Sequence, residues 1–402
     1  MTSHAKKSGT PGSVAEVAML FLRLGLTSFG GPVAHLGYFR EEFVTRRQWL
    51  HEQAYADLVA MCQFLPGPAS SQVGMGLGMM RAGVPGAVAA WIGFTLPSAL
   101  AMTLFALGLP HLEMSNHAGW LHGLKVVAVA VVAQAVWGMA RTLCNDRHRA
   151  TLAILVAILA GAWPTALGQV VAIALGGLLG WAFLRLPGEK PETAPQTTFS
   201  RRAGVVPLIL FGVLLLLLPY LAANHAAPWI QIMDGFYRSG SLVFGGGHVV
   251  LPLLQAEVVQ SGWLHRESFL AGYGAAQAVP GPLFTFAAYL GAAMPFGPSG
   301  WSGGLLALFA VFLPSFLLVA GALPFWEAFR VRPAARSILR GVNAAVVGLL
   351  LAALYHPVWT CGVLSVTDFS IALADFGLLV FWKTPPWLVV ILSAALSALS
   401  SG

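Results

Sequence analysis

The sequence predicts an all-α polytopic membrane protein with two homologous halves in an inverted repeat. Of its 402 residues, 57% are hydrophobic and only 9% are charged, whereas a soluble domain carries about 25% charged residues. The 45 glycines and 25 prolines indicate broken or closely packed helices. A long motif also occurs twice. These observations exclude a soluble enzyme and a free nucleic-acid binder, and they make the lipid bilayer the expected environment.

The repeat is visible in two stretches of eleven residues. Residues 21–31 read Phe-Leu-Arg-Leu-Gly-Leu-Thr-Ser-Phe-Gly-Gly, and residues 236–246 read Phe-Tyr-Arg-Ser-Gly-Ser-Leu-Val-Phe-Gly-Gly. Further matches follow in the same order: Pro66-Gly67-Pro68 with Pro280-Gly281-Pro282, and Pro97-Ser98 with Pro314-Ser315. Many matches in one order indicate a duplicated unit.

The domain organisation follows from the repeat. We divide the chain into a cytoplasmic tail at 1–12, an N-terminal repeat at 13–185, a polar linker at 186–202 and a C-terminal repeat at 203–402. Three distant cysteines, without a CxxC pair, predict neither a disulfide framework nor a zinc site. The chain has no P-loop and no HExxH or haem motif, so we expect no cofactor, no metal and no catalytic residue.

Equivalent loops of the two halves carry opposite charge bias. Segment 330–340 has four arginines and its counterpart 110–122 has no Lys or Arg, while 40–51 has three arginines and 256–265 has none. Because positive loops stay on the cytoplasmic side, the halves are expected to be inverted relative to each other, as in many secondary transporters. The same rule puts the N-terminus in the cytoplasm of a multi-pass inner (plasma) membrane protein.

Four apolar segments, at 14–39, 54–80, 229–255 and 268–296, are longer than the roughly 20 residues of one span. Each is broken near its middle by a Gly-Gly-Pro, Pro-Gly-Pro or Gly-Gly-Gly motif, and the charge pattern requires each to enter and leave on one side. We therefore predict helical hairpins with tips near the midplane, and either re-entrant or spanning hairpins fit the pattern. The other predicted spans are 84–109, 118–140, 150–164, 166–185, 204–221, 302–323, 338–355, 366–382 and 387–400.

The breaks are the candidate binding elements. A broken helix exposes N–H groups with partial positive charge, which suit a small oxyanion, and glycine permits a close approach of the backbone. The alternative interpretation is that the breaks are only kinks that allow tight packing. Four breaks at matching places in the two halves favour a binding function. The candidate residues at and beside the breaks are Ser28, Gly30, Gly31, Gln63, Pro66, Gly67, Pro68, Ser70, Gly245, Gly246, Gln277, Gly281 and Thr285.

Cationic side chains near the breaks point to the same chemistry. Arg23 and Arg238 hold matched positions inside apolar runs, where a charge usually faces protein, a cavity or substrate. Lys125 lies early in a predicted helix, and its counterpart is Asn343. We include all four as candidate substrate-binding residues, and snorkelling to the interface is the other interpretation for the three charged side chains.

The remaining titratable residues near the breaks have ordinary structural explanations. His35 and His248 follow the glycine-rich breaks, and a single histidine there is typical of the core. Glu42, Glu257 and Asp57 are the nearest acids, and either proton relay or helix-end anchoring explains them. They form no carboxylate cluster of the kind that a metal-cation carrier needs.

These motifs resemble the chromate ion transporter (CHR) family. The resemblance rests on residues 24–32, Leu-Gly-Leu-Thr-Ser-Phe-Gly-Gly-Pro, on Pro66-Gly67-Pro68, and on Gly-Val-Pro-Gly at 83–86 before Leu-Pro-Ser at 96–98. The second half repeats the signature, as in the long two-domain form. It departs from the pattern at Gly247 and at 284–285, which indicates that the halves do unequal work.

The resemblance implies a transporter and not an enzyme. Its implied function is chromate efflux across the inner membrane by alternating access, driven by the electrochemical gradient and giving chromate resistance. Sulfate is the close analogue, since both ions are tetrahedral dianions. The alternatives left open are a sulfate or other oxyanion transporter, an anion channel, and a membrane enzyme with residues assembled in space. Fused halves suffice as a monomer, and a homodimer is also open.

Overall fold

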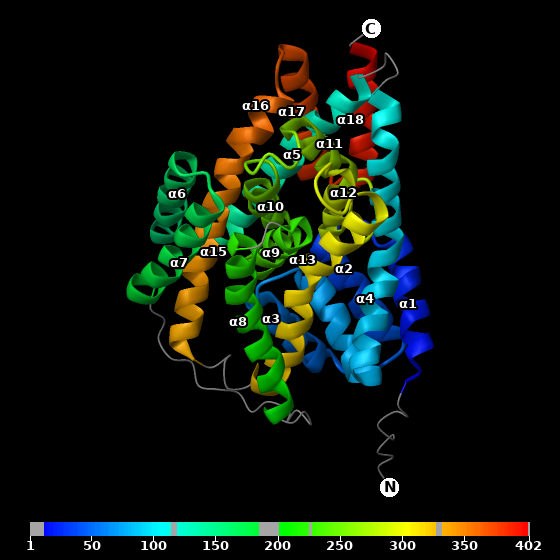
Figure 1. The fold of residues 1–402 in the computed structure, drawn as a ribbon, viewed down its shortest axis with the longest axis vertical. Helices are drawn as coiled ribbons and strands as arrows, with labels where there is room; N and C mark the ends of the chain where they lie inside the picture. Colours follow the sequence, from blue (N-terminus) through cyan, green and yellow to red (C-terminus); the bar gives the residue numbers. More distant parts are fainter. Residues whose placement is uncertain (1–11, 114–118, 185–200, 225–226, 327–331, 401–402) are drawn as a thin grey trace.

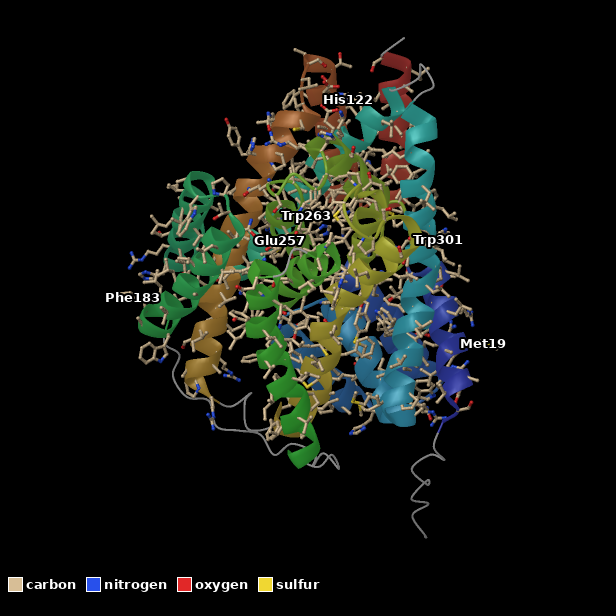
Figure 2. All side chains as sticks on the ribbon, viewed as in Figure 1. Met19, His122, Phe183, Glu257, Trp263 and Trp301 are labelled. Carbon is tan, nitrogen blue, oxygen red and sulfur yellow. The ribbon has the colours of Figure 1, made fainter. Side chains whose placement is uncertain are left out.

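A computed structural model describes residues 12–113, 119–184, 201–224, 227–326 and 332–400 (Figure 1). These residues form helices and connecting turns, with no β-strand among them. Six of the helices are long and apolar enough to cross a membrane. Large apolar side chains such as Met19, Phe183 and Trp301 point outward at the margins of Figure 2, with 73%, 75% and 46% of their surface exposed. Such a girdle suits lipid contact, and the chain is a multi-pass membrane protein.

The first half contains two broken hairpins followed by three long helices. Its elements are α1 (Val14–Thr27), α2 (Gly31–Phe39), the π-helix η1 (Arg40–Arg46), α3 (Glu52–Phe64), α4 (Ala69–Glu113), α5 (Gly119–Leu143), α6 (Arg147–Ala162) and α7 (Ala166–Phe183). The predicted hairpins therefore correspond to α1–α2 and to α3 with the start of α4. The break residues lie between α1 and α2 and between α3 and α4.

The second half repeats this order after one additional helix, α8 (Arg201–Asn224). α8 begins at Arg201, inside the predicted linker that ends at residue 202, and residues 185–200 lie outside the described residues, as does the tail up to residue 11. The repeat elements are α9 (Pro228–Ser241), η2 (Gly247–Val249), α10 (Val250–Val258), α11 (Arg266–Ala276), η3 (Leu283–Thr285), α12 (Phe286–Ala293), α13 (Gly300–Ala322), η4 (Leu323–Phe325), α15 (Pro333–Ala353), η5 (Leu354–Trp359), α16 (Thr360–Gly362), α17 (Val366–Val380) and α18 (Pro386–Ser400).

The two halves run in opposite directions. In Figure 1 the long second part of α4 rises from the lower end of the molecule, whereas its counterpart α13 descends. α5 descends and its counterpart α15 rises. The inverted repeat predicted from loop charges is therefore present in the helix directions.

One connection differs from the expected pattern. The hairpin at 54–80 and the span at 84–109 were expected as separate elements, but α4 runs from Ala69 to Glu113 with a kink. The kink lies at Ala82 and Gly83, whose backbone angles are not helical, and Gly83 has a φ of +65°. Glycine tolerates this conformation, so the chain reverses direction without a loop.

The last helices of each half pack on the other half. α6 and α7 lie on α15, and α17 and α18 lie on α5. Two equivalent glycines permit this contact. A Cβ atom at Gly123 would lie 2.6 Å from the Ser393 carbonyl oxygen, and one at Gly341 would collide with the Gly176 carbonyl. Since small residues let helix backbones approach closely in lipid, the exchange binds the two halves into one body.

Short polar side chains begin several of these helices at matching places. The Asp146 carboxylate accepts the Arg149 N–H (2.9 Å) at the start of α6, and the Ser365 hydroxyl accepts the Asp368 N–H (3.1 Å) at the start of α17. These bonds satisfy otherwise unpaired helix N–H groups. The Arg149 backbone bond and its side chain also hold the pKa of Asp146, which lies in the loop before α6, below its usual range.

We predict that a leucine at either of two equivalent glycines will disrupt helix packing. A Cβ atom at Gly25 would lie 2.7 Å from the Phe94 carbonyl oxygen, and one at Gly240 would collide with the Val311 carbonyl. Gly25→Leu and Gly240→Leu should each cost about 1–3 kcal/mol or more through overpacking, seen as a lower melting temperature in detergent. Gly212→Leu is the control, because no atom lies within 4 Å of its Cβ position. An equal loss in the control would contradict this explanation.

Candidate functional site

The four breaks meet in two reciprocal backbone hydrogen bonds. The Gly67 N–H donates to the Val243 carbonyl (2.7 Å), and the Gly281 N–H donates to the Ser28 carbonyl (2.9 Å). Gly67 and Gly281 are equivalent in the repeat, as are Ser28 and Val243. Each Pro-Gly-Pro tip is therefore tied to the glycine-rich break of the other half.

A second contact marks the axis that relates the halves. A Cβ atom at Gly247 would lie 3.5 Å from Cγ of Pro32, and these two residues are equivalent in the repeat. A residue meets its own counterpart only near the axis of a pseudo-two-fold arrangement. Gly30 and Gly245, beside this contact, are exposed although they interrupt helices inside the molecule. The broken backbone at the axis is thus accessible.

Glycine is required at these tips by backbone conformation. Six predicted site glycines have positive φ angles: Gly30 (101°), Gly31 (77°), Gly67 (124°), Gly245 (75°), Gly246 (156°) and Gly281 (95°). Residues with a Cβ atom rarely adopt these angles. The angles stop each helix and leave its first N–H groups free to bind another group.

The two equivalent serines of the Pro-Ser motifs lie against the tips. A Cβ atom at Gly67 would lie 2.6 Å from the Ser315 hydroxyl oxygen, and one at Gly281 would lie 3.0 Å from that of Ser98. The Gln72 amide donates to the Pro66 carbonyl (2.7 Å) and holds the first tip from its own half. The sequence shows these serines only as part of the repeated Pro-Ser pair. Their position against the tips depends on contact between the halves, which the repeat does not predict.

Several buried polar atoms around the breaks have no hydrogen-bond partner among the described residues. They are the hydroxyl oxygens of Ser28 and Ser71, Nε2 of Gln277, Oδ1 of Asn343 and Oε1 of Gln72. Asn343 Oδ1 lies 3.5 Å from the Cβ position of Gly245, so it borders that break. Because burying an unpaired polar group costs about 1–3 kcal/mol, such a group of atoms indicates a site for a polar ligand.

His35 links the two breaks of the first half. Its Nε2 lies 3.2 Å from the Ser28 carbonyl oxygen, and its Nδ1 lies 3.4 Å from the Ser70 hydroxyl oxygen. The ring is 1% exposed and packs edge-on against Phe94, with centroids 5.2 Å apart. His35 is therefore a core histidine with both ring nitrogens bonded, as the sequence predicts, but the sequence does not predict that it joins two breaks.

The predicted cations lie in ion pairs or beside acids. Arg238 contacts both Asp234 and Glu257, each at 2.9 Å, and both acids are buried. Lys125 Nζ lies 3.8 Å from Glu267 Oε2. The two buried acids compensate the cost of the Arg238 charge, whereas Glu267 is exposed and its pair with Lys125 is solvated.

Arg23 has a different setting from its counterpart Arg238. Its exposed side chain lines a cavity of about 160 Å³ together with Glu41, Glu42 and Arg46. Glu42 binds Arg47 at 2.7 Å, whereas the equivalent Glu257 binds Arg238. The first half therefore leaves Arg23 without an ion pair among the described residues.

The remaining predicted residues divide between the tips and their flanks. Thr285 donates its hydroxyl to the Pro282 carbonyl (2.9 Å), which uses that donor within its own tip. Gln63 is exposed, while its counterpart Gln277 is half-buried. Pro66 and Pro68 flank Gly67, and Pro68 is buried.

A profile of the family described as "Chromate transporter" matches residues 15–181 and 230–398, one match for each half. The chain belongs to the chromate transporter family. The first match runs from the start of α1 to the end of α7, and the second runs from the start of α9 to the end of α18. The duplication in the sequence therefore agrees with the duplication in the fold.

Relatives of similar length support this membership. The chain is 29% identical over 96% of its length to the "Chromate transport protein" of Pseudomonas aeruginosa, of which the match covers 91%. It is 26% identical over 85% of its length to that of Cupriavidus metallidurans, covering 82% of the relative, and 26% identical to an "Uncharacterized transporter" of Methanocaldococcus jannaschii, covering 96% of this chain and 94% of that one. These relatives are transporters, and no enzymatic activity is indicated for the family. No solved structure matches the chain.

We predict that alanine at either Pro-Gly-Pro glycine will destabilise this chromate transporter family member. Alanine at Gly67 or Gly281 must adopt a positive φ, which costs about 1–2 kcal/mol, and it must also displace Ser315 or Ser98. Gly67→Ala and Gly281→Ala should both lower the melting temperature in detergent.

Gly262→Ala separates the two costs. Gly262 has a φ of +74° but no atom within 4 Å of its Cβ position. A smaller loss than at the tips is expected, and the same loss at all three positions would argue against crowding between the halves.

Proposed function

We propose that this chain exports chromate from the cytoplasm across the inner membrane by alternating access and so gives resistance to chromate. The observation that carries the proposal is the group of unpartnered buried polar atoms at the meeting point of the four breaks. The names of the relatives in Pseudomonas aeruginosa and Cupriavidus metallidurans support chromate as the substrate.

The chemistry of the site suits a tetrahedral oxyanion. The unpartnered hydroxyls of Ser28 and Ser71 and the amide nitrogen of Gln277 can donate hydrogen bonds, and each is worth about 1.5–3 kcal/mol when the acceptor is charged. Glycine-initiated helix starts add backbone N–H groups with partial positive charge. Together they replace the water that a dianion loses, and we infer that chromate sits among them.

Alternating access is supported by unequal packing of equivalent helices. α11 packs on α5, where Leu270 and Gly274 are buried. Their counterparts on α3, Ala56 and Ala60, are exposed. In an inverted repeat such a difference corresponds to a substrate path that is closed toward one side of the membrane and less closed toward the other. If the two halves exchanged these packing arrangements, the site would become accessible from the opposite side of the membrane.

The membrane potential alone can drive export of a dianion. One elementary charge crossing 100 mV is worth about 2.3 kcal/mol, so a dianion leaving a negative interior gains about 4.6 kcal/mol. This gain corresponds to a little over three decades of concentration ratio. An obligatory coupling ion is therefore not needed for export.

Sulfate is the second candidate substrate. The unpartnered atoms at the tips belong to neutral side chains, which recognise the shape and charge of a tetrahedral dianion and discriminate little between chromate and sulfate. The same scaffold would then carry sulfate or another oxyanion, and a channel through the breaks would carry anions without saturation.

Radiolabelled chromate flux in inside-out vesicles tests the function. We expect saturable chromate accumulation that increases with an interior-positive potential and decreases with excess sulfate. Accumulation of sulfate without chromate would support the oxyanion site but show that chromate is not the substrate. Anion conductance that does not saturate would show that the protein is a channel and not a carrier.

We also predict that removing one tip donor weakens transport. Gln277→Leu deletes an unpartnered amide without a large change of size, and it should raise the KM for the oxyanion at least about tenfold, the value of one hydrogen bond to a charged group. Gln260→Leu is the matched control, since Gln260 is an exposed residue between α10 and α11. An unchanged KM in Gln277→Leu would remove this residue from the site.

A further inference from the structure

The bridge made by His35 defines where its hydrogen lies. The Ser28 carbonyl is only an acceptor, so the ring nitrogen facing it, Nε2, must donate. In the neutral ring Nδ1 is then the acceptor, and the Ser70 hydroxyl must donate to it. Neutral His35 therefore occupies the hydrogen of Ser70 and keeps it from any ligand at the tips.

A proton on Nδ1 reverses this hydrogen bond. Nδ1–H then donates to the Ser70 oxygen, and the Ser70 hydrogen is free to turn toward another acceptor. The imidazolium also carries one positive charge beside Ser28, whose hydroxyl has no partner among the described residues and whose carbonyl holds the Gly281 tip. One proton thus supplies both a charge and an additional hydroxyl donor at the meeting point of the breaks.

The device is confined to the first half. Val250 stands at the position equivalent to His35, and Phe284 stands at the position equivalent to Ser70. In the second half, the half-buried His248 instead lies 2.8 Å from the Tyr273 hydroxyl, and among the described residues it does not join two breaks. Sequence departures between the halves therefore coincide with a single titratable bridge.

Most acids near His35 are already paired with arginines, so a bound anion is the candidate partner for a positive charge on its ring. α2 packs against α4 and η1, and Tyr55 of α3 donates to the Leu36 carbonyl at 2.6 Å. The acids of η1 pair with arginines of the same region: Glu41 with Arg46, and Glu42 with Arg46 and Arg47. On α1 and α3, Glu16 pairs with Arg47 and Arg81, and Glu52 pairs with Arg40. Further titratable groups on the elements around α2 are Arg23, Tyr38, Asp57 and Cys62.

We propose that His35 is the proton-binding group of the oxyanion site, so that a bound dianion draws one proton from water onto Nδ1 and the two occupy the site together. The inference rests on the proposed function, because the dianion is the charge that stabilises the imidazolium. Opposite charges within about 4–6 Å favour each other strongly where water is excluded. The loaded site then carries one net negative charge less, which halves the electrical driving force on each transport step.

Sulfate binding to the purified, full-length protein at two pH values tests the proposal. Sulfate is the probe because it remains a dianion at both about pH 5.5 and about pH 8, values on either side of the ordinary pKa of histidine. We expect the native protein to bind sulfate more tightly at the lower pH, by about tenfold for each pH unit over which one proton enters with each sulfate. In weakly buffered solution, binding should take up about one proton per sulfate.

His35→Gln is the decisive variant, because its amide can still donate to Ser28 but cannot gain a proton. It should keep the affinity measured at high pH and lose both the acid stimulation and the proton uptake. His248→Gln is the matched control and should keep both. Ser70→Ala retains the histidine and should lose most of the gain in affinity at low pH, which tests the bridge if His35→Gln does not fold.

Four outcomes would overturn the proposal. One is a His35→Gln variant that still binds sulfate more tightly at low pH. Another is a His248→Gln variant that loses this pH dependence. Sulfate binding by the native protein without pH dependence or proton uptake would sink this inference and leave the proposed function standing. Absence of any oxyanion binding at either pH would remove the proposed function and the inference together.

Discussion

The structure depends on how a membrane protein satisfies broken backbone. Each interruption at the tips leaves N–H and carbonyl groups that lipid cannot satisfy. The protein pairs them across the two halves, Gly67 with Val243 and Gly281 with Ser28, so neither half can complete its own tips. The packing of α6 and α7 on α15, and of α17 and α18 on α5, stabilises these contacts between the halves from outside. Fusion in one chain therefore joins two units that are structurally incomplete apart.

The same crossing concentrates polar groups at one place. Helix starts, hydroxyls and amides gather where apolar side chains would otherwise fill the space, and several remain unpartnered. The strongly charged side chains are arranged differently: Arg238 and Lys125 contact acids, and Arg23 borders a cavity near Glu42. Neutral donors at this place would bind the proposed anion without holding it too tightly to release, which a carrier requires.

Symmetry of the backbone does not extend to the side chains. Arg238 has Asp234 and Glu257, whereas Arg23 has Met19 in place of the first acid, and its equivalent of the second, Glu42, binds Arg47. His35 and Ser70 have Val250 and Phe284 as counterparts. The first half thus holds the proposed proton site, whereas the second half pairs its arginine with acids and contributes the unpartnered amide nitrogen of Gln277. Duplication permits this division, because both halves supply backbone to the tips while their side chains differ.

The sequence by itself determined the membrane class, the duplication, the inversion and the positions of the four breaks. Composition, loop charge and glycine–proline motifs act locally, and their effects survive in any packing. Only the tertiary structure decided that Gly281 meets Ser28, that Ser98 and Ser315 lie against opposite tips, and that Arg238 is neutralised by acids. These are contacts between residues far apart in the chain. Their partners depend on how two inverted halves cross, which no local pattern encodes.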